Sequence, residues 1–177
     1  MTGQKITDNI ESTSGVKQIS SKKENTLSTS TLNLLCDVDT LRTLIKEKKV
    51  RIVDVRKKDE YLEGHIPTSV SLPLGDLLSD DSPKSIIRIL NNLGISDETA
   101  VVVYDDTFGA LASRVAWSFK FVGHKNVSLL EVTYSGWKNL GLDIEKKSNS
   151  FAKSFHSTNI DYSIYADAAY VENAHND

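Results

Sequence analysis

The sequence predicts an α/β fold of three layers, in which a central parallel sheet carries helices on both faces. Strand-like runs alternate with amphipathic helical segments through the middle of the chain, and this alternation is typical of parallel sheets with right-handed crossovers. The runs at residues 50–55 and 100–104 are almost continuously apolar and rich in β-branched residues. Such runs indicate strands buried on both faces. With 177 residues, 39% of them hydrophobic, the chain is long enough for one medium-sized domain.

The first predicted elements lie between residues 34 and 72. Order is expected to begin at the short apolar run 34–36, after which Asp37 can cap a helix. The apolar residues of that helix recur at three- and four-residue spacing, and it is expected to end near the lysines at 46, 48 and 49. A strand at 50–55 follows. A short strand at 69–72 comes after the turn formers Gly64 and Pro67.

The remaining predicted elements complete the alternation. Ser82 and Pro83 begin a helix that Gly94 ends, and the buried strand 100–104 follows. A helix over 110–122, terminated by Gly123, precedes a strand at 127–130. The apolar residues expected to close the core after this strand are Trp137, Leu140 and Leu142.

Composition divides the chain into three parts. Residues 1–31 are polar and follow neither a helical nor an alternating period, which predicts a disordered tail. The α/β domain is expected over 32–147. Residues 148–177 are expected to hold a linker and the remnant of the start of a second domain, because Asp167 to Val171 repeats the helix-start pattern of Asp37 to Leu41. We expect residues 151–165 to dock on the first domain and residues 166–177 to be mobile.

Composition also excludes several function classes. The net charge of −3 with interspersed basic residues gives no electrostatic footprint for nucleic acid. No apolar run suits a membrane span or a secretion signal, so we expect a cytoplasmic protein without membrane contact. One cysteine excludes an internal disulfide framework, and the four histidines lack zinc-type spacing. We therefore expect neither a metal nor a cofactor.

The junction after the strand at 100–104 is the most informative feature for function. The chain passes from Asp105 and Asp106 through Gly109 into a helix, so backbone N–H groups and the positive end of a helix dipole should point at one place. Such a socket suits an anion or a reactive thiolate. Asp105 offers no sulfur, and its carboxylate would itself occupy the anion site.

This junction and three other motifs resemble the rhodanese (thiosulfate sulfurtransferase) family. The motifs are residues 53–56, 60–67 and 123–127. The order Tyr104-Asp105, Gly109, Arg114, Trp117, Gly123-His124 is most similar to the non-catalytic N-terminal domain of two-domain sulfurtransferases.

The resemblance implies a rhodanese-like domain whose loop is degenerate at Asp105, Asp106, Gly109 and Arg114, because active members carry Cys at the position of Asp105. It further implies a binding or scaffold module without sulfur transfer. Its expected partner is a separate catalytic rhodanese domain or a second copy of the chain.

Two departures from the family pattern bear on the socket. Val132 and Thr133 stand where the family usually has glycines, so we expect a changed backbone there. The stretch from Asp105 to Arg114 is also longer than in active domains. We expect these departures to keep the N–H groups from converging on one sulfur, so that Asp105→Cys alone would not restore activity.

Two enzyme classes remain as alternatives. A sulfurtransferase could use Cys36, the only thiol of the chain, or a partner's catalytic domain; the apolar neighbours of Cys36 instead indicate a buried core residue. Metal-dependent phosphoryl transfer could use Asp105 and Asp106, although adjacent residues that leave a strand point in divergent directions.

Several conspicuous side chains are interpreted as structural. We expect a local ion pair between Asp54 and Arg56, and pairing of Arg114 with Asp105 or Asp106. The residues expected to serve hydrogen bonding or packing are His65, His124, Trp117 and Trp137.

Overall fold

The computed structural model describes residues 32–174; the tail predicted for residues 1–31 lies outside this range. The described chain contains a five-stranded parallel sheet with the order β1-β5-β4-β2-β3. This architecture confirms the predicted α/β class. The strands are β1 (Leu35–Cys36), β2 (Val50–Asp54), β3 (Val70–Ser71), β4 (Ala100–Tyr104) and β5 (Val127–Leu130).

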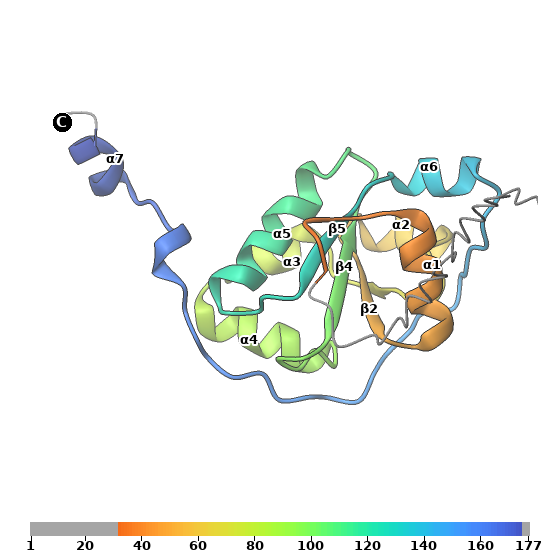
Figure 1. The fold of residues 1–177 in the computed structure, drawn as a ribbon, viewed down its shortest axis with the longest axis horizontal. Coiled ribbons are helices and arrows are strands. Elements are labelled where there is room, and N and C mark those ends of the chain that lie inside the picture. Colours follow the sequence, from red (N-terminus) through yellow and green to blue (C-terminus); the bar gives the residue numbers. More distant parts are fainter. Residues whose placement is uncertain (1–31, 175–177) are drawn as a thin grey trace, which may run out of the picture. The chain divides into compact units, whose positions relative to one another are not determined.

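Helices connect the strands and extend beyond them. They are α1 (Val38–Glu47), α2 (Lys58–Glu63), α3 (Leu74–Leu78), α4 (Pro83–Asn92), α5 (Ala110–Phe121), α6 (Tyr134–Asn139), the 3₁₀ helix η1 (Tyr162–Ile164) and α7 (Ala168–Ala174). Figure 1 shows α5 beside the central strand β4, from which it continues through one short loop.

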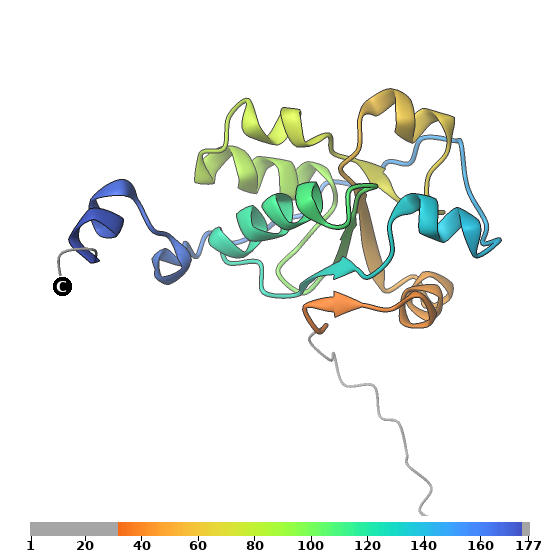
Figure 2. The same ribbon diagram turned by 90° about the horizontal axis from the view of Figure 1, so that it is seen from above.

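The sheet separates two apolar cores. One core packs one face of β2 and β4 against α3, α4 and α5, and its residues Phe119 and Leu90 are fully buried. The other joins the opposite faces of these strands to α1 and α6, with Leu41 and Trp137 at its centre. Figure 2 shows the two sets of helices on opposite sides of the strands. The three predicted layers are therefore present.

Local sequence signals account for the long helices. Asp37 accepts a hydrogen bond from the Thr40 amide at 2.7 Å and so caps α1. Ser82 caps α4, with Pro83 in its first turn. The helix predicted over 110–122 ends one residue earlier, at Phe121.

One core prediction is wrong. Leu140 is 59% exposed, because α6 ends at Asn139 and turns this side chain outward, whereas Trp137 is buried as predicted. Within residues 32–174 no helix has both the length and the apolar character that crossing a membrane requires.

Residues 151–165, called the strap below, pack against the domain as predicted. Figure 1 shows the strap running along the edge of the sheet where β2 and β4 begin. The Ser154 amide donates to the Asn91 carbonyl at 3.0 Å, and the Asp161 amide donates to the Phe121 carbonyl at 2.8 Å. Phe151 lies against the guanidinium of Arg51, 3.0 Å from the ring centroid. The strap therefore contacts the domain along most of its length.

Helix α7 extends beyond the strap. The Asp167 carboxylate accepts from the Tyr170 amide at 2.7 Å, as Asp37 does at the start of α1. The residues that follow each cap differ in burial: Leu41 is fully buried, whereas Val171 is 58% exposed. The repeated sequence pattern therefore forms a repeated helix start, and in α7 the apolar residue is not covered by the domain.

Candidate functional site

The Asp105 carboxylate is the centre of the loop between β4 and α5. It accepts five hydrogen bonds, from the Thr107 hydroxyl and from the amides of Thr107, Gly109, Leu111 and Ala112, at 2.8–3.0 Å. The N–H groups therefore converge, and the expectation that they would not is wrong. Five donors from one short segment leave the carboxylate oxygens fully engaged.

The strand and the helix explain this geometry. Strand β4 is buried and delivers Asp105 to the carboxyl edge of the sheet, where the first turn of α5 leaves its amides without intrahelical acceptors. Burial raises the pKa of Asp105, but the hydrogen bonds from Ala112, Gly109 and Thr107 outweigh it and hold this pKa below its usual range. Asp105 is therefore an anion whose side chain caps the N-terminus of α5.

The tip of the loop is conformationally unusual. Gly109 adopts φ +85°, which a glycine tolerates, and Phe108 adopts φ +55°, which a non-glycine residue rarely does. The Phe108 ring is 95% exposed. The bonds to Asp105 on both sides of Phe108 hold the backbone in this conformation.

The Asp106 carboxylate faces a different element. It accepts from the Ser135 amide at 2.8 Å and from the Ser135 hydroxyl at 2.7 Å, at the start of α6. Burial raises the pKa of Asp106, but these bonds lower it below the ordinary value. Asp105 and Asp106 thus diverge, as expected, and do not form one cluster of carboxylates.

The segment that lacks the family glycines has an ordinary backbone. Thr133 adopts φ −69° and caps α6 through its side chain, which accepts from the Gly136 amide. Thr133 thus forms a regular helix cap, which Asp106 reinforces, and the expected difference from the family's backbone stays a prediction.

Arg114 does not pair with Asp105 or Asp106, so that prediction is wrong. Its guanidinium donates to Asp81 at 2.9 Å and to the Ser118 hydroxyl at 2.6 Å. Arg114 lies one turn into α5, which places its side chain beside the loop before α4. The amides, and no arginine, neutralise Asp105.

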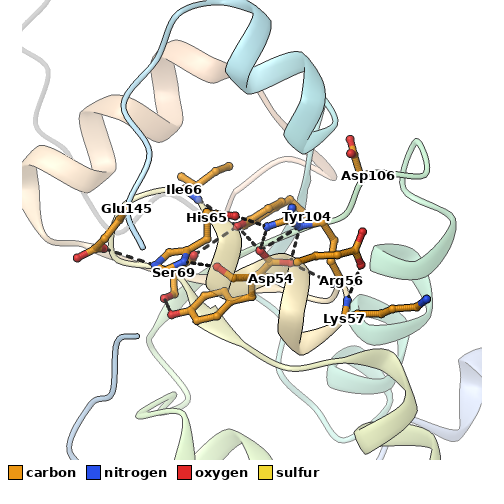
Figure 3. Close-up of polar contacts among 12 residues, drawn as sticks. Asp54, Arg56, Lys57, His65, Ile66, Ser69, Tyr104, Asp106 and Glu145 are labelled. Carbon is orange, nitrogen blue, oxygen red and sulfur yellow. Dashed lines mark hydrogen bonds and ion pairs between the residues drawn. The ribbon is translucent and has the colours of Figure 1, made fainter. Parts of the chain in front are cut away.

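A buried polar network lies at the carboxyl ends of β2 and β4 (Figure 3). The predicted pair is present: Arg56 Nη2 donates to Asp54 Oδ2 at 2.6 Å and Arg56 Nε donates to Asp54 Oδ1 at 3.0 Å. The Tyr104 hydroxyl donates to the same carboxylate at 2.5 Å, and the Tyr134 ring covers the guanidinium at 3.7 Å. Burial lowers the pKa of Arg56, but Asp54 outweighs it and raises this pKa. Arg56 is therefore held by Asp54 through Nε and Nη2, and Nη2 also donates to the Gly64 carbonyl at 2.8 Å.

His65 has a structural role, as predicted. Its Nδ1–H donates to the Tyr61 carbonyl at 2.8 Å, and its ring stacks on that of Tyr61 with centroids 3.8 Å apart. The side chain is fully buried, and Glu145 lies 3.8 Å from Nε2. The histidine thus fixes the turn that follows α2.

Cys36 is buried, which confirms the core interpretation. It is 2% exposed on the edge strand β1. Burial, together with the nearby charges of Asp37 and Glu131, raises the pKa of its thiol to about 11. The thiolate is the attacking form in sulfur transfer, so this environment disfavours the chemistry.

The remaining predicted residues lie away from the loop. Trp137 is buried in the second core, and Trp117 lies on the surface of α5, where its indole donates to the Ile164 carbonyl at 3.3 Å. His124 is fully buried beside a second buried histidine of the strap, His156. This second histidine was not singled out from the sequence, because the spacing of 32 residues gives no local signal.

Comparisons with known proteins agree with this architecture. The family model described as "Rhodanese-like domain" matches residues 37–140. The thiosulfate sulfurtransferase of Bos taurus is 34% identical over 94 residues, which is 48% of this chain and 32% of that protein. The sulfur carrier protein TtuD of Thermus thermophilus is 28% identical over 131 residues, which is 67% of this chain and 44% of that protein. The chain thus spans less than half the length of these relatives.

A solved structure shows the same fold. SseA from Escherichia coli, from work on 3-mercaptopyruvate sulfotransferases, superposes with a TM-score of 0.71 at 22% sequence identity. The match covers 81% of this chain and 62% of SseA.

Proposed function

Because the chain belongs to the family of rhodanese-like domains, we propose that it is a sulfurtransferase-related binding module that does not transfer sulfur at its own loop. One observation carries the proposal: the Asp105 carboxylate takes up the amides of the loop and of the first turn of α5. In an active member the same donors would stabilise a thiolate or persulfide.

The chemistry of sulfur transfer supports this reading. A thiolate attacks the outer sulfur of thiosulfate, forms a cysteine persulfide and releases sulfite, and the persulfide sulfur then passes to an acceptor such as cyanide. A carboxylate cannot hold sulfur in this way. Its negative charge at Asp105 also repels the thiosulfate dianion from the donors that would bind it.

The side chains around the loop support the same conclusion. Arg56 is committed to Asp54, and Arg114 is committed to Asp81. The only thiol, that of Cys36, is buried with a raised pKa. The reading as an enzyme that uses Cys36 is therefore disfavoured.

The outer face of α5 and the strap supports a binding role. Tyr165 packs on Phe121 with ring centroids 5.5 Å apart and also contacts Trp117, yet Tyr165 is 48% exposed and Tyr162 is 68% exposed. An aromatic surface of this kind suits another protein. The proposed partner is a separate cysteine-bearing rhodanese domain, or a second copy of the chain.

An activity assay tests the absence of catalysis. The purified chain and Cys36→Ser are incubated with thiosulfate and cyanide, and thiocyanate is measured against a control without protein. We expect no excess thiocyanate from either protein. Turnover that Cys36→Ser abolishes would overturn the proposal.

A binding assay tests the partner. Tyr165→Ser, with the matched exposed variant Tyr170→Ser on α7, is compared with the unmodified chain by light scattering and by titration with a catalytic rhodanese domain. We expect Tyr165→Ser to weaken the complex by about tenfold or more, as a truncated interface aromatic does. Equal affinities for all three proteins, or no complex at high concentration, would contradict the binding surface.

A further inference from the structure

Two buried histidines join the strap to the domain. His124 follows the end of α5 and is fully buried, and His156 lies in the middle of the strap and is 2% exposed. His124 Nδ1 lies 3.2 Å from His156 Nε2. The rings are 5.2 Å apart between centroids, and this contact is the innermost point of the strap.

Hydrogen-bond chemistry limits the protons that the pair can hold. His156 Nδ1 lies 2.6 Å from the Ser157 carbonyl, which only accepts, so this nitrogen carries a proton. The 3.2 Å between His124 Nδ1 and His156 Nε2 leaves room for one proton between these two nitrogens. If both facing nitrogens carried protons, two N–H groups would oppose each other and the buried pair would hold at least one positive charge.

The charged groups around the pair offset an added positive charge only in part, because burial outweighs the effect of Asp97 on the pKa of His124. Asp97, in the loop before β4, lies 3.4 Å from His156 Nδ1 and also accepts from the Ser157 amide and hydroxyl. Lys125 follows His124 in the chain. Hydrogen bonds from Ser163 and, secondarily, the positive charge of Lys125 lower the pKa of Asp161 in the strap. The edge of the Phe119 ring closes the side toward α5. One carboxylate thus faces two imidazoles.

We propose that the His124–His156 contact is an acid-sensitive latch, which holds the strap on the domain at neutral pH and releases it when the buried pair takes up a further proton. The strap has no comparable buried side chain elsewhere among its described residues, because its other members are exposed or partly exposed. Loss of this contact therefore removes the one buried anchor of the strap.

The sign of the pH dependence follows from linkage. Burial, and secondarily the charge of His156, lowers the pKa of His124 from an ordinary 6.5 to about 4 while the strap is docked. The released state binds protons more readily, so docking is favoured above pH 6.5 and weakens as the pH falls toward 4. Over this window the ratio of docked to released strap falls by up to about tenfold per pH unit.

Release would change the surface that the chain presents. Tyr162 and Tyr165 of the strap pack on Phe121, and the Asp161 amide donates to the Phe121 carbonyl. Phe121 is now 8% exposed. An unlatched strap would uncover the α5 face to which these aromatic rings are now fixed.

Hydrogen exchange with mass spectrometry tests the latch in the full chain. Protection of the strap amides is measured at pH 7.5 and pH 5.0, with correction for the intrinsic exchange rates. The matched variant is His124→Asn, which keeps side-chain hydrogen bonding but removes the imidazole whose pKa burial lowers. We expect strap protection to fall at least tenfold at pH 5.0 in the unmodified chain and to change little in His124→Asn, while the amides of β4 stay protected in both.

Strap protection that falls equally in both proteins would overturn the proposal, and so would strap protection that is the same at the two pH values in the unmodified chain. Loss of β4 protection together with the strap would also overturn it, because it would indicate global unfolding. If the His124→Asn strap is unprotected at both pH values, His124→Gln is compared by the same criterion.

Discussion

Asp105 shows how a side chain of the chain itself can complete an anion-binding loop. Backbone N–H groups at the start of a helix need an acceptor, which in an anion-binding loop is the ligand. Here the acceptor is covalently part of the chain, and it takes up four amides and a hydroxyl. The donors of the loop are therefore satisfied by the chain itself, which explains how the loop keeps its shape without a ligand.

The variant Asp105→Cys tests whether the shape of this loop is sufficient for activity. In a Cys36→Ser background, the new thiol should have a pKa below the ordinary value of about 8.5, because the converging amides favour the thiolate. The rate of alkylation as a function of pH measures this pKa.

The same variant should still form no thiocyanate. The arginines that could attract thiosulfate are engaged elsewhere, Arg56 with Asp54 and Arg114 with Asp81. Robust turnover would show that these pairs open during catalysis and would contradict this account of the loop.

Asp54 is expected to be the most sensitive polar residue for stability. Asp54→Asn leaves the buried guanidinium of Arg56 without its counter-charge, so it should lower the free energy of unfolding by about 3–5 kcal/mol. Urea denaturation measures the change. The control is Asp39→Asn, which disrupts the exposed pair with Arg42 and should change stability by less than about 1 kcal/mol. Similar losses in the two variants would contradict the importance of burial.

At the scale of elements, two glycines allow the backbone of the strap to approach the domain closely. Gly94 and Gly123 follow the ends of α4 and α5 with φ of +69° and +98°. A Cβ on Gly94 would meet the Ala152 carbonyl oxygen at 2.8 Å, and a Cβ on Gly123 would collide with the Asn159 carbonyl oxygen. Both helix ends thus combine a left-handed turn with a close approach of the strap backbone.

Gly123→Ala should therefore detach the strap around Asn159. Its matched control is Gly141→Ala, which shares the positive φ but has no neighbour within 4 Å of the added Cβ. Both variants should lose about 1 kcal/mol from the left-handed conformation. Only Gly123→Ala should also lose hydrogen-exchange protection in the strap. Equal strap protection in the two variants would contradict the close approach.

The elements that the sequence predicted well are those with strong local signals. Asp37, Pro83 and Gly123 mark helix ends by chemistry that acts over a few residues, and the apolar run of β4 has the length of a buried strand. The short helices α2, α3 and α6 are absent from the sequence prediction, because five or six residues are too few to show a period.

Long-range pairings were beyond the sequence signals. Arg114 was expected to pair with the acidic residues of its own loop, but it reaches Asp81, 33 residues earlier. The His124–His156 contact likewise joins segments 32 residues apart. Local spacing gives no information on which distant side chain the fold will bring near, so these partners required the structure.

At the scale of the whole molecule, the chain combines a complete rhodanese-like sheet with a loop that holds its own anion and with an aromatic outer face. The family explains the sheet and the position of the loop. The carboxylate at that position explains why we propose binding in place of catalysis. The strap adds a surface whose exposure, by our inference, depends on pH.

The half-reaction with thiosulfate tests the central claim most directly, because it requires no acceptor. The purified chain is incubated with thiosulfate, and its intact mass is recorded under non-reducing conditions. We expect no gain in mass, since Asp105 cannot form a persulfide and Cys36 is buried. A gain of one sulfur atom on a substantial fraction of the protein, lost on treatment with cyanide, would contradict it.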